Sequence, residues 1–185
     1  MTESASKRLI SMGPIEQFGA DEVFRALGAP VIDVRYVGGC VRDSILGRPV
    51  SDIDLATPDI PQTVIKKVAK AGLRAIPTGL SHGTITVFSQ GFGFEVTTLR
   101  RDTAAHGRYA EVEFTLDWEE DASRRDFTFN AMSARPDGTL FDYYGGECDA
   151  RAGRVRFIGD PRDRIREDYL RILRYFRFLA LYGQE

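Results

Sequence analysis

The sequence has few of the residues that build disulfide frameworks or zinc sites. It contains two cysteines, Cys40 and Cys148, and two histidines, His82 and His106. With His82 and His106 as the only histidines, a zinc site is not favoured, and two thiols do not make a disulfide framework outside a secreted protein. The sequence therefore supports neither kind of stabilisation.

Long hydrophobic runs are also missing. No apolar stretch approaches the roughly 18 residues that would span a bilayer, and residues 1–7 lack the apolar core of a signal peptide. We therefore expect a cytoplasmic protein with no membrane contact. The hydrophobic share of 43% and the charged share of 28% are those of a globular protein, and 185 residues can form one domain and part of a second.

The net charge is small, at −2, which by itself does not favour nucleic-acid binding. The distribution is uneven, because residues 151–185 contain nine arginines, no lysine and five acidic residues, a local charge of +4. Such a surplus fits polyanion binding, and it also fits a solvated, charge-rich helix face.

The stretch from Val37 to Leu55 combines a glycine turn with two carboxylates. An apolar, strand-like run ends at Val37 and is followed by Gly38-Gly39 and a helix-compatible segment. Glycines after a strand let the backbone approach a ligand, and the following helix start favours an anion, so phosphate is the expected guest. Arg42 adds a positive fork nearby.

Asp52-Ile53-Asp54 ends this stretch in a strand-like context. Residues two apart on a strand project from one face, with Cα atoms about 6.5 to 7 Å apart. At an effective dielectric of about 20, two such charges about 5 Å apart repel by about 3 kcal/mol, which calls for a counter-charge such as Mg²⁺. An isolated Asp-x-Asp also fits a solvated turn or helix cap, but the preceding glycine turn and Arg42 favour the metal.

Gly38-Gly39-Cys40-Val41-Arg42-Asp43, followed by Asp52-Ile53-Asp54, resembles the signature of class II tRNA nucleotidyltransferases and bacterial poly(A) polymerases. The resemblance implies an α+β fold, the polymerase-beta-like nucleotidyltransferase head, with a mixed, largely antiparallel sheet. It also implies that the first helix of an all-α neck domain follows the head.

A second block, residues 124–131, is similar to the R-R-D-F-T-x-N-A block of this family and follows an acidic helical segment, residues 117–123. Arg125 can donate in a fork to phosphate oxygens, and Asp126 and Asn130 can bond sugar hydroxyls. Alternatively, Asp126 caps a helix that contains Asn130.

A third block, residues 166–178, is similar to the family pattern E-D-x-x-R-x-x-R-x-x-R-F. Helical spacing places four polar side chains near one another: Asp168, Arg171, Arg174 and Arg177. The same spacing assigns the core face of the helix to Leu170, Leu173 and Phe176 or Phe178. Arg171 could simply pair with Glu167 or Asp168 along an ordinary helix. The resemblance instead implies that Asp168 and Arg171 select the base, C and then A.

Glu95 lies in the second of two alternating runs, residues 83–88 and 92–99, which predict a hairpin turning at residues 89–91. If that strand neighbours the Asp-x-Asp strand, Glu95 can complete a three-carboxylate cluster; otherwise it is a surface residue. Helices are expected over residues 14–27 and 61–71. Residues 100–111 are polar and aperiodic and predict a loop, either a simple connector or, by the resemblance, one that helps switch nucleotides.

The resemblance implies a nucleotide site and a metal site that draw on all three blocks. The nucleotide residues are Gly38, Gly39, Arg42, Arg125, Asp126, Asn130, Asp168, Arg171, Arg174 and Arg177. Asp52 and Asp54 would hold Mg²⁺ and, with Glu95, form the catalytic set. Residues 1–13 are expected to be disordered, residues 14–158 to form the head, and residues 159–185 to begin the neck.

The implied enzyme adds CMP and AMP from CTP and ATP to the 3′ end of tRNA. Residues 79–84 lack the arginine-containing block that poly(A) polymerases carry after the Asp-x-Asp strand, which favours CCA addition. An A-only or CC-only enzyme stays open. Family members have further neck, body and tail parts, so the alternative is a nucleotide-binding head that cannot elongate tRNA alone. The sequence does not indicate an oligomeric state.

Overall fold

A computed structural model of the chain describes residues 8–16, 18–104 and 111–184. Its strands are β1 (Arg8–Leu9), β2 (Arg35–Val37), β3 (Ile53–Thr57), β4 (Arg74–Gly79), β5 (Thr84–Ser89), β6 (Phe92–Thr98), β7 (Arg100–Ala104), β8 (Glu111–Phe114), β9 (Ser133–Ala134) and β10 (Thr139–Phe141). Its helices are α1 (Gly13–Glu16), α2 (Asp21–Leu27), α3 (Gly39–Ile45), α4 (Pro61–Lys70), α5 (Trp118–Ser123), α6 (Gly146–Arg151), α7 (Pro161–Glu167) and α8 (Leu170–Tyr182), with 3₁₀ turns η1 (Leu80–His82) and η2 (Thr128–Asn130).

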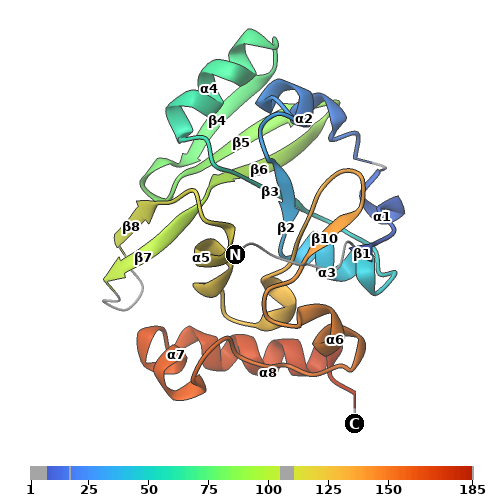
Figure 1. The fold of residues 1–185 in the computed structure, drawn as a ribbon, viewed down its shortest axis with the longest axis vertical. Coiled ribbons are helices and arrows are strands. Elements are labelled where there is room, and N and C mark those ends of the chain that lie inside the picture. The colour runs from blue at the N-terminus through green and yellow to red at the C-terminus, as the bar shows by residue number, and fades with distance from the viewer. Residues whose placement is uncertain (1–7, 17, 105–110, 185) are drawn as a thin grey trace, which may run out of the picture.

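The strands of the described chain form one large sheet and one small one. The large sheet has the order β1-β10-β9-β2-β3-β6-β5-β4, and β7 pairs with β8. Strands β3 and β6 are parallel, and the other pairs are antiparallel. The α+β fold with a mixed, largely antiparallel sheet is therefore confirmed. Figure 1 shows this sheet above and α7 and α8 below.

The hairpin predicted around residues 83–99 is confirmed. Strands β5 and β6 pair from Thr84–Thr97 to Ser89–Phe92. The two residues between them, Gln90 and Gly91, both have positive φ values, 51° and 84°. Two-residue turns of this kind match the twist of antiparallel strands. Because alternate residues of β5 face inward, Ile85 and Val87 are buried.

The core lies between the sheet and its helices. One apolar cluster joins Val23, Phe24 and Leu27 of α2 to Val64 and Val68 of α4 and to the inward residues of β3, β5 and β6. The predicted helix over residues 61–71 is confirmed as α4, which begins at Pro61 and is followed by Gly72 with φ of 77°. These contacts hold β3, the strand that carries Asp54, in the middle of the sheet.

Helix α8 packs on the preceding part of the fold through an aromatic stripe. Phe178 lies 5.5 Å, centroid to centroid, from Phe127 and 5.4 Å from Phe129, and Tyr175 stacks on Phe157 at 5.9 Å. The predicted core face was wrong in part, because Leu170, Leu173 and Phe176 are 42, 68 and 62% exposed, whereas Phe178 is buried. Helical spacing gives the period of a buried stripe, but the partner surface decides its phase.

Asp168 also differs from the prediction. It lies between α7 and α8 with an extended backbone, φ −152° and ψ 108°, and is therefore not part of one continuous helix. Its carboxylate accepts a hydrogen bond from the backbone N–H of Leu170 at 3.0 Å. Short polar side chains compete in this way with helical hydrogen bonds and mark helix starts.

Three other expectations change. The helix predicted over residues 14–27 is two helices, α1 and α2, separated at Gly19, which has φ of +63°. Residues 8 and 9 form β1 and pair with β10, so the disorder expected for residues 1–13 does not extend to them; residues 1–7 lie outside the described chain.

Part of the predicted loop, residues 100–104, is strand β7, paired with β8, while residues 105–110 lie outside the described chain. Figure 1 shows this two-stranded sheet projecting beside the main one. Arg101 bonds Glu113 across the pair at 2.9 Å. Because both faces of such a ribbon can be polar, its sequence carries no hydrophobic alternation, which explains why the strand was missed.

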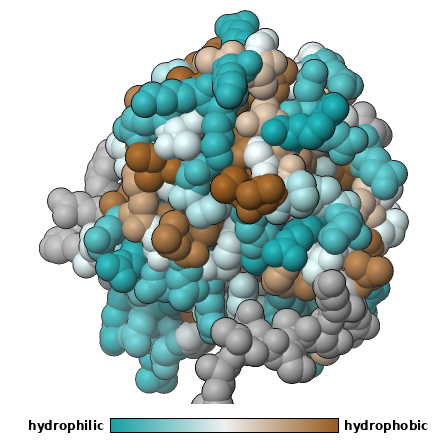
Figure 2. All heavy atoms as spheres, turned by 45° about the horizontal axis from the view of Figure 1, so that its top comes forward, coloured by the Kyte–Doolittle hydropathy of each residue, from teal (hydrophilic) through white to brown (hydrophobic). Residues whose placement is uncertain are grey.

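The surface is mixed in polarity. Figure 2 shows hydrophobic patches separated by hydrophilic side chains on the face that it presents. Among the described helices, none is long and apolar enough to cross a bilayer.

Candidate nucleotide-binding site

One cavity of about 700 Å³ gathers twelve of the thirteen site residues predicted from the sequence. It lies between β3, α3, η2 and α8. The twelve are Gly38, Gly39, Arg42, Asp52, Asp54, Arg125, Asp126, Asn130, Asp168, Arg171, Arg174 and Arg177. Three blocks that lie far apart in the sequence therefore line one surface, and only Glu95 is not among its lining residues.

The glycine turn is favoured by its backbone conformation and lies close to Arg125. Gly38 precedes α3 with φ of 72° and ψ of −126°, a conformation that L side chains rarely adopt. A Cβ atom there would lie 3.1 Å from Nη1 of Arg125. Cys40, in the next turn, donates its S–H to the carbonyl of Val37, and burial raises the pKa of its thiol to about 12. Cys40 is thus a core residue and not a nucleophile.

Asp52 and Asp54 lie on the β3 side of the cavity. Asp54 is the second residue of β3, and Asp52 precedes the strand and accepts a hydrogen bond from the Ser51 hydroxyl at 2.7 Å. Burial, followed by the charges of Glu95 and Asp52, raises the pKa of Asp54 to about 6, although Arg125 acts in the opposite direction. This side of the cavity holds more negative charge than its neighbours compensate.

Glu95 lies beside Asp54 in the sheet, because the parallel register of β3 and β6 pairs these two residues. Its side chain is exposed and is not part of the cavity lining. Within the described residues, no group of three or more His, Cys, Asp or Glu side chains is placed to hold a metal ion. The strand adjacency that the prediction required is present, and a catalytic role for Glu95 stays a prediction.

The opposite side of the cavity is a continuous hydrogen-bond chain. Arg42 donates through Nη1 to Oδ1 of Asn130 at 2.6 Å, and Asn130 donates through Nδ2 to Oδ1 of Asp126 at 3.2 Å. Arg174 of α8 donates through Nε to Oδ2 of Asp126 at 2.6 Å. Asp126 also caps the next backbone N–H, that of Phe127, at 2.8 Å. Residues from each of the three predicted blocks are thus joined in a single chain.

Tyr182, which the sequence reasoning missed, supports the same chain. Its hydroxyl donates to Oδ1 of Asp43 at 2.9 Å and accepts from Nη2 of Arg42 at 2.6 Å. Arg42 and Asp43 also form a bidentate pair at 2.9 and 2.8 Å. Arg42 is therefore fixed by α3, η2 and the end of α8. No local pattern separates Tyr182 from any other aromatic residue of an amphipathic helix.

Arg171 and Arg177 differ in their surroundings. Arg171 pairs with Glu167 at 2.5 Å, the pair that the ordinary-helix alternative predicted, although the two residues lie in different helices; Arg171 also donates to the carbonyl of Arg164 at 2.8 Å. Arg177 is exposed and lines the cavity, and its guanidinium makes no ion pair or hydrogen bond with the residues that the structure describes. It is thus accessible to an anion in the cavity.

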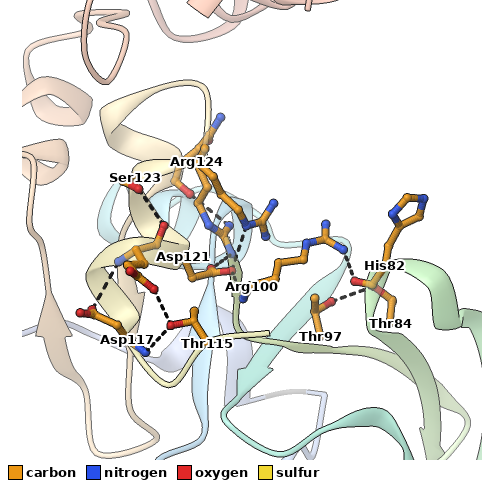
Figure 3. Close-up of polar contacts among 12 residues, drawn as sticks. His82, Thr84, Thr97, Arg100, Thr115, Asp117, Asp121, Ser123 and Arg124 are labelled. Atoms are coloured by element: carbon orange, nitrogen blue, oxygen red, sulfur yellow. Dashed lines mark hydrogen bonds and ion pairs between the residues drawn. The ribbon is translucent and has the colours of Figure 1, made fainter. Parts of the chain in front are cut away.

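Asp121 is a second residue that the sequence reasoning passed over, and Figure 3 shows it at the centre of a polar cluster. The residue is 3% exposed. Its carboxylate accepts from Nε of Arg124 at 3.0 Å, from Nη2 of Arg125 at 3.2 Å and from the backbone N–H of Arg100 at 3.2 Å. The signal in the sequence was an Asp three and four residues before an Arg-Arg pair.

Comparison with known proteins agrees with this arrangement. Residues 34–156 match the family model of the poly A polymerase head domain. The chain belongs to this family, and the resemblance drawn from its three blocks is confirmed.

Its relatives include tRNA nucleotidyltransferases. The chain is 51% identical over 147 residues to the mitochondrial CCA tRNA nucleotidyltransferase 1 of Mus musculus, a match that covers 79% of this chain and 34% of the relative. It is 39% identical over 163 residues to the CCA-adding enzyme of Latilactobacillus sakei, 87% of this chain and 40% of that one. The chain thus spans less than half the length of these relatives.

Solved structures give the same result. The CCA-adding enzyme of Bacillus stearothermophilus in complex with CTP matches with a TM-score of 0.78 at 37% identity, over 90% of this chain and 39% of that one. A tRNA nucleotidyltransferase complexed with a primer tRNA and an incoming ATP analog matches with a TM-score of 0.68 at 31% identity, over 85% and 44%.

Proposed function

We propose that this chain carries the catalytic head of an RNA nucleotidyltransferase that adds CMP and AMP from CTP and ATP to the 3′ end of tRNA. The observation that carries the proposal is the single cavity lined by twelve residues from three separate sequence blocks. The names of the similar proteins support the substrate class, since they include a CCA-adding enzyme bound to CTP and a tRNA nucleotidyltransferase bound to tRNA and an ATP analog.

The carboxylate side of the cavity suits a divalent cation. Asp52 and Asp54 offer hard oxygen ligands, and the pKa of Asp54 is raised by burial first and then by the charges of Glu95 and Asp52, against the opposing charge of Arg125. We propose that these two residues hold Mg²⁺, which would supply charge neutralisation for the triphosphate and for the attacking hydroxyl. Magnesium dependence and the role of Glu95 belong to the proposal.

The remaining residues position the nucleotide. Arg177 offers its guanidinium to phosphate oxygens, and Arg125 lies where its charge acts on Asp54. The second N–H of the Asn130 amide and the remaining lone pair on Oδ2 of Asp126 can bond sugar hydroxyls. In the transfer, the RNA 3′-hydroxyl attacks the α-phosphorus and pyrophosphate leaves, a step that depends mainly on positioning and charge.

Base choice is assigned to Asp168 and Arg171. Both line the cavity at the start of α8, together with the carboxylates of the β3 side. Arg171 is held by Glu167 and by backbone carbonyls, so its orientation is fixed before a nucleotide enters. A preorganised donor beside a carboxylate is a suitable reader of a base edge, which carries both donors and acceptors.

A second candidate is a nucleotide-binding head that requires further protein to elongate tRNA. The observation that favours this candidate is that the match covers only 34% of the length of the mouse tRNA nucleotidyltransferase. The cytoplasmic location expected from the sequence stays a prediction. The mouse relative is named as a mitochondrial enzyme. Poly(A) addition and A-only or CC-only addition remain alternatives for the specificity.

The test is to incubate the chain and Mg²⁺ with CTP and ATP, one of them labelled, and a tRNA ending at the discriminator base. Addition of two CMP residues followed by one AMP supports CCA addition, whereas a long A tract indicates poly(A) synthesis. Metal-dependent binding of CTP without any extension supports the second candidate. Absence of both transfer and triphosphate binding would overturn the proposal.

A further inference from the structure

Arg125 lines the cavity and is held there by three contacts, of which only the one with Asp121 involves a residue outside the cavity lining. Its Nη1 donates to the carbonyl of Asn130 at 3.3 Å, and its Nη2 donates to Oδ2 of Asp121 at 3.2 Å. Gly38 also lies close to it, since an added Cβ there would lie 3.1 Å from Nη1. The guanidinium is thus fixed in a narrow space, and the only charged group among these three contacts is Asp121.

Asp121 is a buried carboxylate, and the desolvation free energy of its charge has to be offset by hydrogen bonds and neighbouring cations. Burial by itself would raise its pKa, but the charges of Arg125 and Arg124 and the Arg100 N–H outweigh burial and lower the pKa. The two oxygens have different donors. Oδ1 accepts from Arg124 and from the backbone of Arg100, and Oδ2 accepts from Arg125. Figure 3 shows this carboxylate between α5 and the start of β7.

The Arg100 contact anchors this arrangement to the main sheet. Arg100 follows Leu99, whose N–H donates to the carbonyl of Thr57 at the end of β3 at 2.9 Å. The side chain of Arg100 donates to the carbonyl of His82. Asp121 therefore ties the position of Arg125 to the same strand that carries Asp54.

From this geometry we infer that Asp121 is a positioning residue for nucleotidyl transfer, which acts by orienting Arg125 toward the site of the α-phosphate and Asp54. The inference rests on the proposed function. It assigns Asp121 no contact with substrate, since the residue does not line the cavity. It differs from a purely structural role, because all of its effect on transfer has to pass through Arg125.

Asp149 offers a matched control. It is also a buried carboxylate, 1% exposed, and it bonds Thr128 at 2.7 Å and Arg156 at 2.7 Å. It does not line the cavity, and its bonds involve other residues than Arg125. Asp149→Asn therefore reproduces the loss of a buried charge without the loss of the Arg125 contact.

The test is a double-mutant cycle in a protein whose wild type transfers CMP. Asp121→Asn is expected to lower kcat/KM for CTP by about tenfold to a hundredfold, the scale of a misplaced catalytic group. In an Arg125→Ala background the same change should have less than about a threefold effect, because its target is gone. Asp121→Glu should recover part of the loss, and Asp149→Asn should leave kcat/KM within about threefold of wild type.

Folding is measured in parallel, with each assay well below the variant's unfolding midpoint. If Asp121→Asn does not fold, Asp121→Glu replaces it in the cycle. An equal loss in the wild-type and Arg125→Ala backgrounds would overturn the inference while leaving the proposed function intact. If the wild type binds CTP but transfers nothing, the cycle is measured on the Kd for CTP, with additivity again as the contradicting outcome.

Discussion

The two sides of the cavity differ in how far their carboxylates are hydrogen-bonded and neutralised. On the η2 and α8 side, Asp126 accepts from Asn130, Phe127 and Arg174, and Arg42 closes the chain. On the β3 side, burial and neighbouring acids raise the pKa of Asp54 to about 6. Satisfied polar groups preorganise a site, whereas uncompensated charge marks the place where a ligand has still to bind.

The largest expected effect is at the uncompensated side. Asp52→Ala or Asp54→Ala should reduce transfer by about a thousandfold or more, because each removes a carboxylate that is proposed to hold a metal ion, and such an ion supplies several kcal/mol to the transition state. The variants should fold, since Asp52 is exposed and Asp54 is not a member of the apolar core. Single-turnover extension of tRNA with Mg²⁺, alongside thermal unfolding, checks this.

Magnesium-dependent transfer within about tenfold of wild type in either variant would remove the catalytic assignment. Should the wild-type chain bind triphosphate without extending tRNA, loss of metal-dependent binding is the equivalent readout.

On the η2 and α8 side of the cavity, where both oxygens of the carboxylate accept hydrogen bonds, a substitution should reduce stability. Asp126→Ala removes the acceptor of Arg174 and leaves the buried Nδ2 of Asn130 without its partner. We expect a loss of about 2 to 4 kcal/mol in the free energy of unfolding, as for other broken buried networks. Denaturant unfolding measures it.

The matched control for Asp126 is Asp163→Ala. Asp163 pairs with Arg166 at 3.3 Å with side chains 68 and 74% exposed, so this change should stay within about 0.5 kcal/mol. Equal losses in the free energy of unfolding at the two positions would show that the hydrogen-bond chain from Arg42 to Arg174 contributes no more stability than an exposed ion pair.

Removing the uncompensated charge should stabilise the metal-free protein. The folded pKa of Asp54, about 6, exceeds the ordinary value of 3.8, so the folded state binds the proton more tightly and ionisation costs stability as the pH rises from about 4 to about 6. At pH 8, Asp54→Asn should therefore raise the free energy of unfolding by about 3 kcal/mol, the equivalent of about two pKa units.

That gain should vanish below about pH 4, where the carboxyl is protonated in both states. Added Mg²⁺ should stabilise the wild type more than the variant. If Asp54→Asn is no more stable than wild type at pH 8, or if Mg²⁺ stabilises it as much as it stabilises wild type, the prediction of an unneutralised carboxylate at Asp54 is wrong.

The sequence allowed the local elements around the site to be predicted better than their packing. The glycine turn, the α3 segment and the β5–β6 hairpin follow from short patterns, and the convergence of the three blocks was what the family resemblance implied. The phase of α8 does not, since Leu170 and Leu173 satisfy the same helical period as Phe178, and only the aromatic surface of Phe127 and Phe129 selects between them.

Asp121 and Tyr182 were missed for a related reason. Tyr182 acts through Arg42, which is distant in the sequence, so a lone Tyr in an aromatic helix carries no local sign of its partner. Asp121 has two local partners, Arg124 and Arg125, but its contact with the backbone of Arg100, which links it to the main sheet, is not visible in the local pattern. Tertiary contacts that satisfy a charge are visible in the structure and not in the periodicity.

The smallest expected effect concerns Asp168, where the two sides of the cavity meet the nucleotide base. Its carboxylate already accepts from the Leu170 N–H, so Asp168→Ala should cost about 1 kcal/mol of stability as a lost helix cap, whether or not the residue reads a base. Stability alone therefore does not separate the two roles.

Selectivity does separate them. If the carboxylate reads the base edge, Asp168→Ala should reduce discrimination among CTP, ATP, UTP and GTP by about tenfold to a hundredfold, the effect of one unsatisfied polar group of about 1 to 3 kcal/mol. Total triphosphate affinity should change less, because Arg42, Arg174 and Arg177 would still bind the phosphates, which carry no information about the base. Competition binding of the four triphosphates to wild type and variant measures both quantities, and unchanged affinity ratios with a lower unfolding midpoint would leave Asp168 as a helix cap only.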